Sequence, residues 1–174
     1  MKTLTLKRLL LTAGMLIAAG QALAQATPEY RAKAGFLYNF IAFTEWPAKV
    51  DSPLNLCVYG ADPFGDELNA LQGKSVNGRS LAIRSVSTPD QVKGCQVVFV
   101  AGSAIDSLPR ILDALEGEPV LTVADSTGAL DSGVGINMRV RQSKITFEVN
   151  LVATRRAQLN VSSKLLRLAS EVRQ

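Results

Sequence analysis

The chain has 174 residues, of which 47% are hydrophobic and 20% are charged. It contains 19 basic and 15 acidic residues, two cysteines and no histidine. The absence of histidine excludes the commonest general base and metal ligand, and with them every serine–histidine or cysteine–histidine catalytic arrangement. We expect a single domain over residues 25–174, since a chain of this length can bury one ordinary core.

The first 24 residues have the pattern of a secretory signal peptide. A positively charged start (Lys2, Lys7 and Arg8) precedes an apolar stretch, and residues 22–24 (ALA) have the small–x–small pattern of a cleavage site. The apolar stretch is too short to span a membrane comfortably. We therefore expect cleavage after Ala24 and a periplasmic location. The 16 basic and 15 acidic residues that are left give a net charge of +1, which does not indicate a nucleic-acid binder.

A helix is predicted to begin at Pro28. Thr27 before it offers a capping hydroxyl, and proline suits the first helical turn. Apolar residues recur at helical spacing over 34–43, which predicts a broad buried stripe. Trp46 precedes a proline, and proline disfavours the helical conformation of the residue before it. The helix should therefore end at Trp46.

The middle of the chain alternates between predicted strands and helices. Strands are expected at 54–59, 76–87 and 96–101, and the second contains an Asn77-Gly78 turn signal. The third (QVVFVA) is a nearly continuous apolar run, which is typical of a parallel strand buried on both faces. Further elements are expected in the order helix 63–71, helix 108–115 and buried strand 119–124.

The pattern changes after residue 124. Residues 125–135 form a loop rich in glycine, serine and aspartate, and two alternating stretches, 136–140 and 145–149, predict an antiparallel hairpin. A helix over 151–159 and a last helix capped by Ser162 follow. The predicted fold class is α/β: a single domain with a largely parallel sheet flanked by helices and a C-terminal antiparallel hairpin at its edge.

The two cysteines lie in apolar stretches of the predicted sheet. In an oxidising compartment an even number of cysteines favours a disulfide, here between Cys57 and Cys95. Two buried free thiols are the alternative. A metal site is disfavoured, because two cysteines without histidine or C-x-x-C spacing offer too few soft ligands. We expect neither a metal nor a cofactor.

Other catalytic patterns are missing as well. Asp125 and Asp131 lie in the glycine-rich loop without a visible partner pattern, and forming turns is the simpler role for such short acidic side chains. Residues 128–135 (GALDSGVG) lack the lysine and hydroxyl of a phosphate-binding loop. Backbone amides at 102–104 could bind an anion, which is a weak signal common to α/β proteins. The sequence therefore predicts a protein that is not an enzyme.

Four segments go beyond a generic α/β pattern, namely 33–47 (KAGFLYNFIAFTEWP), 56–60 (LCVYG), 94–100 (GCQVVFV) and 145–169, which begins ITFEVNL. In order and spacing they resemble the YfiR/HmsC-like family over nearly the whole mature chain. The resemblance implies a periplasmic repressor that binds the periplasmic sensor domain of an inner-membrane diguanylate cyclase, so that cyclic di-GMP and biofilm formation fall. It also implies homodimers and disulfide control of stability. This chain lacks the second cysteine pair that some relatives carry, which puts switching through an additional bridge in doubt.

Six residues are predicted to contact a partner or a ligand: Phe40, Phe43, Trp46, Arg79, Asn150 and Arg156. Trp46 should be exposed at a helix exit, and tryptophan is enriched at interface hot spots. The phenylalanines could instead form core, and Asn150 and Arg156 could serve local capping and surface solvation. The alternative function is a periplasmic small-ligand-binding protein, in which Trp46 beside Arg79 or Arg156 clamps a planar or anionic ligand in the crevice of the sheet.

Overall fold

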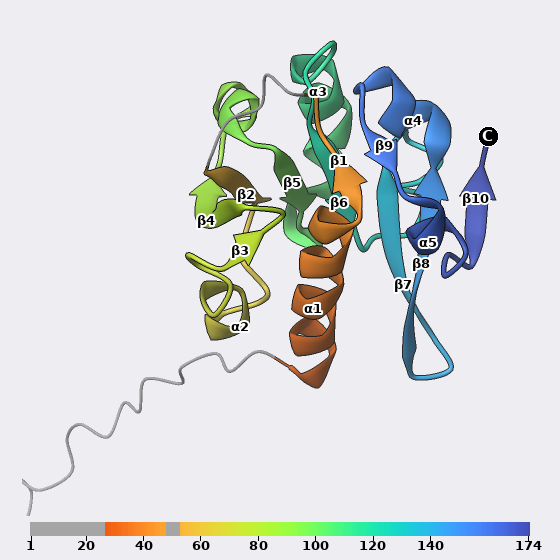
Figure 1. The fold of residues 1–174 in the computed structure, drawn as a ribbon, viewed down its shortest axis with the longest axis horizontal. Coiled ribbons are helices and arrows are strands. Elements are labelled where there is room, and N and C mark those ends of the chain that lie inside the picture. The colour runs from red at the N-terminus through yellow and green to blue at the C-terminus, as the bar shows by residue number, and fades with distance from the viewer. Residues whose placement is uncertain (1–26, 48–52) are drawn as a thin grey trace, which may run out of the picture.

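The computed structural model describes residues 27–47 and 53–174 (Figure 1). The predicted signal peptide and its cleavage site lie outside these ranges. Within them, no helix is both long and apolar enough to cross a bilayer. The helices are α1 (Pro28–Ala42), α2 (Asp66–Asn69), η1 (Pro89–Gly94), η2 (Gly102–Ser107), α3 (Leu108–Ala114), α4 (Leu151–Arg156) and α5 (Ser163–Leu166), where η marks a 3-10 helix. The strands are β1 (Thr44–Glu45), β2 (Leu54–Tyr59), β3 (Ser75–Val76), β4 (Arg79–Val86), β5 (Val97–Val100), β6 (Leu121–Ala124), β7 (Ile136–Arg141), β8 (Lys144–Asn150), β9 (Asn160–Val161) and β10 (Glu171–Arg173).

Eight strands form one sheet in the order β10-β8-β7-β6-β5-β2-β4-β3. The run from β4 through β2, β5 and β6 to β7 is parallel, and β8 returns antiparallel to β7. This arrangement confirms the predicted α/β class with its largely parallel sheet and antiparallel hairpin. The structure adds β10, which pairs parallel with β8 and lies beyond the hairpin.

Helices cover both faces of the sheet, with α1 in front and α3 behind in the view of Figure 1. Along β5, Val97 and Phe99 belong to the apolar cluster on the α1 side, whereas Val98 and Val100 belong to the cluster on the α3 side. Successive side chains of a strand point to opposite faces. The continuous apolar run of this strand is therefore explained by burial on both faces, as predicted.

Both hairpins turn through two residues with positive φ. Asn77 and Gly78 have φ of 51° and 78° between β3 and β4, and Gln142 and Ser143 have φ of 50° and 60° between β7 and β8. Turns with positive φ at both central positions match the right-handed twist of the flanking strands. The turn signals in the sequence are thus confirmed.

The helix expected over 63–71 covers only Asp66–Asn69. Two other helices are shorter than predicted because short strands replace their ends. The first, α1, ends at Ala42, and β1 follows it and pairs antiparallel with β9. The helix expected over 151–159 ends at Arg156, since Gln158 has a φ of 58° and turns the chain into β9. Pairing between segments far apart in the sequence here outweighs the local helical pattern.

Candidate functional site

The six residues predicted to make contacts do not converge on one site. Phe40 is fully buried, and its ring centroid lies 5.0 Å from that of Phe147 and 6.0 Å from that of Phe36. It therefore belongs to the core beneath α1. Phe43 and Arg79 are half-buried and lie at the end of α1 and the start of β4.

The expectation that Trp46 is exposed is wrong. Trp46 comes directly after β1, which pairs with β9, and only 8% of the residue is accessible to solvent. Its indole nitrogen has no hydrogen-bond partner within the described ranges. The chain leaves α1 four residues earlier than predicted, and the extended segment that follows carries Trp46 into the core instead of out to solvent.

Asn150 and Arg156 lie at the two ends of α4. The Asn150 side chain accepts a hydrogen bond of 3.0 Å from the backbone N–H of Ala153 and so caps the helix. Arg156 is exposed and lines a cavity between α3 and α4. Neither Trp46 nor Arg79 lines that cavity, so the predicted clamp of tryptophan and arginine is not formed there.

The cap at Asn150 gives a stability prediction. Asn150→Ala is expected to lower the free energy of unfolding by about 1 kcal/mol, because the first turn of α4 loses its side-chain acceptor. Urea denaturation followed by circular dichroism measures this loss. Asn150→Asp, which keeps an acceptor oxygen, should stay within a few tenths of a kcal/mol of the natural protein. Equal losses in the two variants would contradict the capping role.

A buried charged network that the sequence did not reveal joins α1 to the carboxyl end of β6. Lys33 Nζ donates to Asp125 Oδ2 at 2.7 Å, and both side chains are only 4% exposed. The Lys33 ammonium also donates to Glu29, one helical turn away. The Tyr30 hydroxyl donates to the same Asp125 oxygen at 3.0 Å, and Lys33 Nζ lies 4.4 Å from the centroid of the Tyr30 ring.

The protonation states of this network follow from its contacts. Burial lowers the pKa of Lys33, but hydrogen bonds to Asp125 and Glu29 outweigh it and hold the pKa above the ordinary value of 10.5. Burial, followed by the Asp125 charge, raises the pKa of Tyr30 above 10.0. A lysine held in its charged form is neither a nucleophile nor a base at neutral pH. The network therefore has a structural role: it links α1 to the carboxyl end of β6.

Both loop aspartates have partners that the sequence did not predict, and Asp131 also lies in a turn, as predicted. Asp125 holds Lys33, and Asp131 accepts from Arg173 Nη1 at 2.5 Å. Two sequence features give a weak indication of the Lys33–Asp125 pair. Lys33 lies on the buried stripe of α1 together with Leu37, and Asp125 comes directly after a fully buried strand. The pairing itself spans 92 residues and leaves no local pattern.

The predicted disulfide between Cys57 and Cys95 is confirmed. The two Cα atoms lie 6.0 Å apart, and the described ranges contain no free cysteine. Cys57 lies in β2, and Cys95 follows η1. Both belong to the apolar cluster on the α3 side, so the bridge ties the crossover between β4 and β5 to the middle of the sheet.

A partly exposed apolar face lies in front of β8. Phe36 on α1 packs against Phe147 with ring centroids 5.9 Å apart. The turn after α5 also reaches Phe147, because the Ser170 N–H and hydroxyl both donate to its carbonyl oxygen. Leu168 in this turn is 72% exposed. We define the front apolar face by the partly exposed apolar side chains of this region, Phe36, Ile145, Leu166 and Leu168.

Solved structures share the fold at low sequence identity. A conserved domain protein from Vibrio cholerae O1 biovar El Tor is 8% identical with a TM-score of 0.58, and the match covers 86% of this chain and 61% of that one. An ABC domain in complex with L-Trp from Streptococcus pneumonia is 7% identical (TM-score 0.55; 82% and 60% covered). A substrate-binding protein with adhesive properties from Clostridium difficile, in its ligand-free open form, is 12% identical (TM-score 0.53; 82% and 59% covered). The chain spans about three fifths of the length of these proteins.

A family model described as YfiR/HmsC-like matches residues 30–170. The match extends from α1 to the turn after α5, and it includes the four segments on which the resemblance was predicted. With nearly all of its described residues covered, the chain belongs to the YfiR/HmsC-like family.

Proposed function

We propose that this protein represses an inner-membrane diguanylate cyclase by binding the cyclase's periplasmic sensor domain, which lowers cyclic di-GMP and biofilm formation. The family match over residues 30–170 carries the proposal. The chain has no histidine for general acid–base catalysis, and the buried Lys33 is held by two carboxylates. In this proposal the protein is a periplasmic homodimer that acts through surface complementarity, without catalysis or a cofactor.

The front apolar face is the surface that we assign to the cyclase. Clustered apolar side chains at a surface mark interaction sites, and Leu168 is the most exposed large apolar residue of the described chain. Phe36 adds an aromatic ring, a side chain enriched in interface cores. Phe43 and Arg79 are proposed as further contacts because both are partly exposed. Trp46 is not proposed, since it is buried.

The test is the cyclic di-GMP level of cells that contain the partner cyclase. Deleting the gene should raise cyclic di-GMP, and the natural protein should restore the low level. Leu168→Glu places a charge on the front apolar face and should not restore it. Val152→Glu is the matched control, because Val152 is 48% exposed on α4, outside that face, and this variant should repress fully.

Immunoblots of periplasmic extracts must find both variants at the natural level, so that loss of repression is not loss of protein. Unchanged cyclic di-GMP after deletion would contradict the proposed function. Full repression by Leu168→Glu would contradict only the assignment of the surface. Light scattering on the mature protein tests the homodimer, and mass spectrometry of its N-terminus tests cleavage after Ala24.

A second candidate function is the binding of a small molecule. Arg156, one of the six predicted contact residues, lines a cavity of about 260 Å³. The fold is also shared with proteins described as binding L-Trp or a substrate. Binding of a small molecule and repression of a cyclase are compatible, because a molecule in the cavity could tune the affinity for the partner.

A further inference from the structure

The cavity lies between α3 and α4, at the amino end of β6. Its volume of about 260 Å³ is slightly below the range of roughly 300–1,000 Å³ typical of pockets for drug-sized ligands, so it suits a smaller molecule. Its apolar lining comes from the end of α3, the start of β6 and the turn before β9. The apolar lining residues that matter here are Leu115, Val120, Leu121 and Leu159.

Small residues keep this space open. Ala153 lies on α4 and Ala157 caps its C-terminus, and both line the cavity. Gly135 also lines the cavity, and a Cβ added there would lie 3.2 Å from the Thr122 carbonyl oxygen and 3.2 Å from Thr154 Cγ2. A larger residue at this position would therefore press on Thr122 of β6 and Thr154 of α4, which both line the cavity.

Charges of both signs line the cavity. Asp113, Glu116 and Glu118 come from the end of α3 and the turn after it, and Arg156 comes from the end of α4. The salt bridges within the described ranges all join other residues, so none of these four charges is closer than 4.0 Å to an opposite one. The acidic side chains also lie at a helix C-terminus, where negative charge is locally unfavourable.

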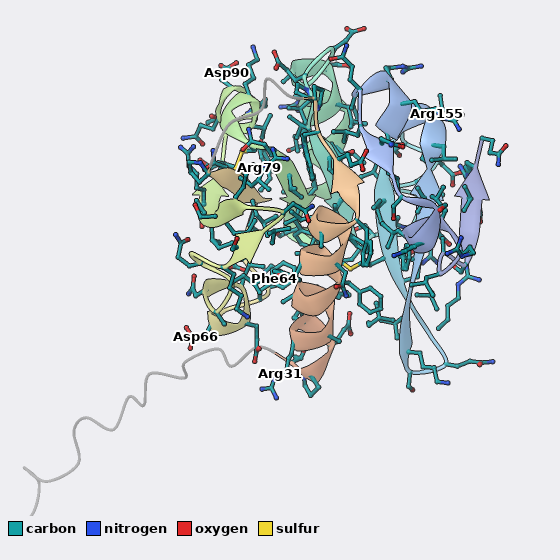
Figure 2. The ribbon with its side chains drawn as sticks, in the orientation of Figure 1. Arg31, Phe64, Asp66, Arg79, Asp90 and Arg155 are labelled. Atoms are coloured by element: carbon teal, nitrogen blue, oxygen red, sulfur yellow. A yellow bond between two sulfur atoms is a disulfide. The ribbon has the colours of Figure 1, made fainter. Side chains whose placement is uncertain are left out.

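The usual ligand crevice of an open α/β sheet is at the carboxyl ends of its strands. Here the Lys33–Asp125 pair and the fully buried Phe64 occupy that edge. Figure 2 shows Phe64 beside α1. The cavity is at the other end of β6, since Leu121 and Thr122 line it and Asp125 follows the strand's last residue. It is therefore separate from both the charged network and the front apolar face.

We infer that this cavity binds a small zwitterion with an apolar body, of the class of α-amino acids with apolar side chains. Its carboxylate pairs with the Arg156 guanidinium, which can donate two parallel hydrogen bonds. Its ammonium group faces the acidic side chains of the α3 wall, and its body covers the apolar lining. The inference rests on the second candidate function and is independent of repression of the cyclase.

The test is calorimetric titration of the purified mature protein, first with three compounds that share a phenyl ring and differ in their charged groups. L-phenylalanine carries both charges, phenethylamine lacks the carboxylate, and 3-phenylpropionate lacks the ammonium group. L-leucine and L-methionine extend the series to smaller bodies. At least one of the three amino acids should bind saturably, and for phenylalanine the removal of either charge should weaken binding at least tenfold.

Variants locate the site. Arg156→Gln should weaken binding of the amino acid at least tenfold, whereas Arg155→Gln should leave it unchanged, because the exposed Arg155 on α4 does not line the cavity (Figure 2). Ala153→Leu should abolish binding by filling the space, and its circular dichroism and unfolding curve show whether it folds. No saturable binding of any amino acid, equal binding of a singly charged probe, or unchanged binding by Arg156→Gln would each overturn the inference. None of these results bears on repression, which the gene deletion tests in cells.

Discussion

Asp125→Asn is expected to lower the free energy of unfolding by about 3 kcal/mol, although it changes no side-chain volume appreciably. Removing one member of a buried ion pair leaves the other charge uncompensated, at a cost of roughly 3–5 kcal/mol. The Lys33 side chain is 4% exposed and would keep one carboxylate partner, Glu29, whose side chain is 42% exposed. The loss should therefore lie near the lower end of that range. Urea denaturation of the purified mature protein measures it.

A second ion pair with the same N–O separation provides the control. Arg31 Nε lies 2.7 Å from Glu67 Oε1, the same separation as in the Lys33–Asp125 pair, but the Arg31 side chain is 71% exposed. Figure 2 shows Arg31 at the outer end of α1. Arg31→Gln should cost less than about 1 kcal/mol, since exposed pairs contribute little. Similar losses in the two variants would show that burial does not set the strength of the Lys33–Asp125 pair.

The Lys33–Asp125 pair should make the free energy of unfolding depend on pH in the alkaline range. The folded-state pKa of Lys33 is raised above 10.5, so its stabilising effect is complete below that value and is lost as pH rises through the raised pKa. The raised pKa of Tyr30 acts in the same direction above pH 10.0. The difference between the natural protein and Asp125→Asn should persist from pH 7 to about pH 10 and shrink beyond it. A constant difference at higher pH would contradict this assignment of charges.

The parts of the fold that the sequence predicts are those with a local cause. The run over 97–101 is apolar throughout because both of its faces are buried. The Asn77-Gly78 pair predicts a turn because glycine and asparagine tolerate positive φ. The β1–β9 pair has no such cause. Each strand has two residues, too few to show a period, and the side-chain contact between Glu45 and Asn160 spans 115 residues.

The candidate sites were harder to predict than the fold. A lysine on a buried helix stripe signals a partner, but nothing near Lys33 indicates that the partner is Asp125. The cavity depends on small residues from three separate segments, which come together only once α3, α4 and the loop before β7 are packed. The sequence predicts Arg156 as a contact residue, but it does not predict the acidic side chains that line the same cavity. A sequence pattern indicates which residues of one helix or strand are buried, but it does not indicate which helices and strands pack against each other.

Removing the Cys57–Cys95 disulfide is expected to lower the free energy of unfolding by about 4 kcal/mol. The bridge closes a loop of 38 residues, and the chain-entropy model gives about that gain for a loop of this length, because the cross-link restricts the unfolded chain. Both cysteines are almost fully buried, so substitution also removes packing from the cluster on the α3 side. Reduction of the natural protein keeps both sulfur atoms in place, and it separates the two effects.

Urea denaturation should therefore be compared for three samples: the oxidised protein, the same protein in dithiothreitol, and Cys57→Ala/Cys95→Ala. We expect the reduced protein to lose about 4 kcal/mol and the double variant to lose somewhat more, since alanine leaves space where sulfur packs. Dithiothreitol should not change the double variant further. A reduced protein as stable as the oxidised one would mean that β2 and the segment after η1 are already held together by packing, and the cross-link would then contribute nothing to the folded domain's stability.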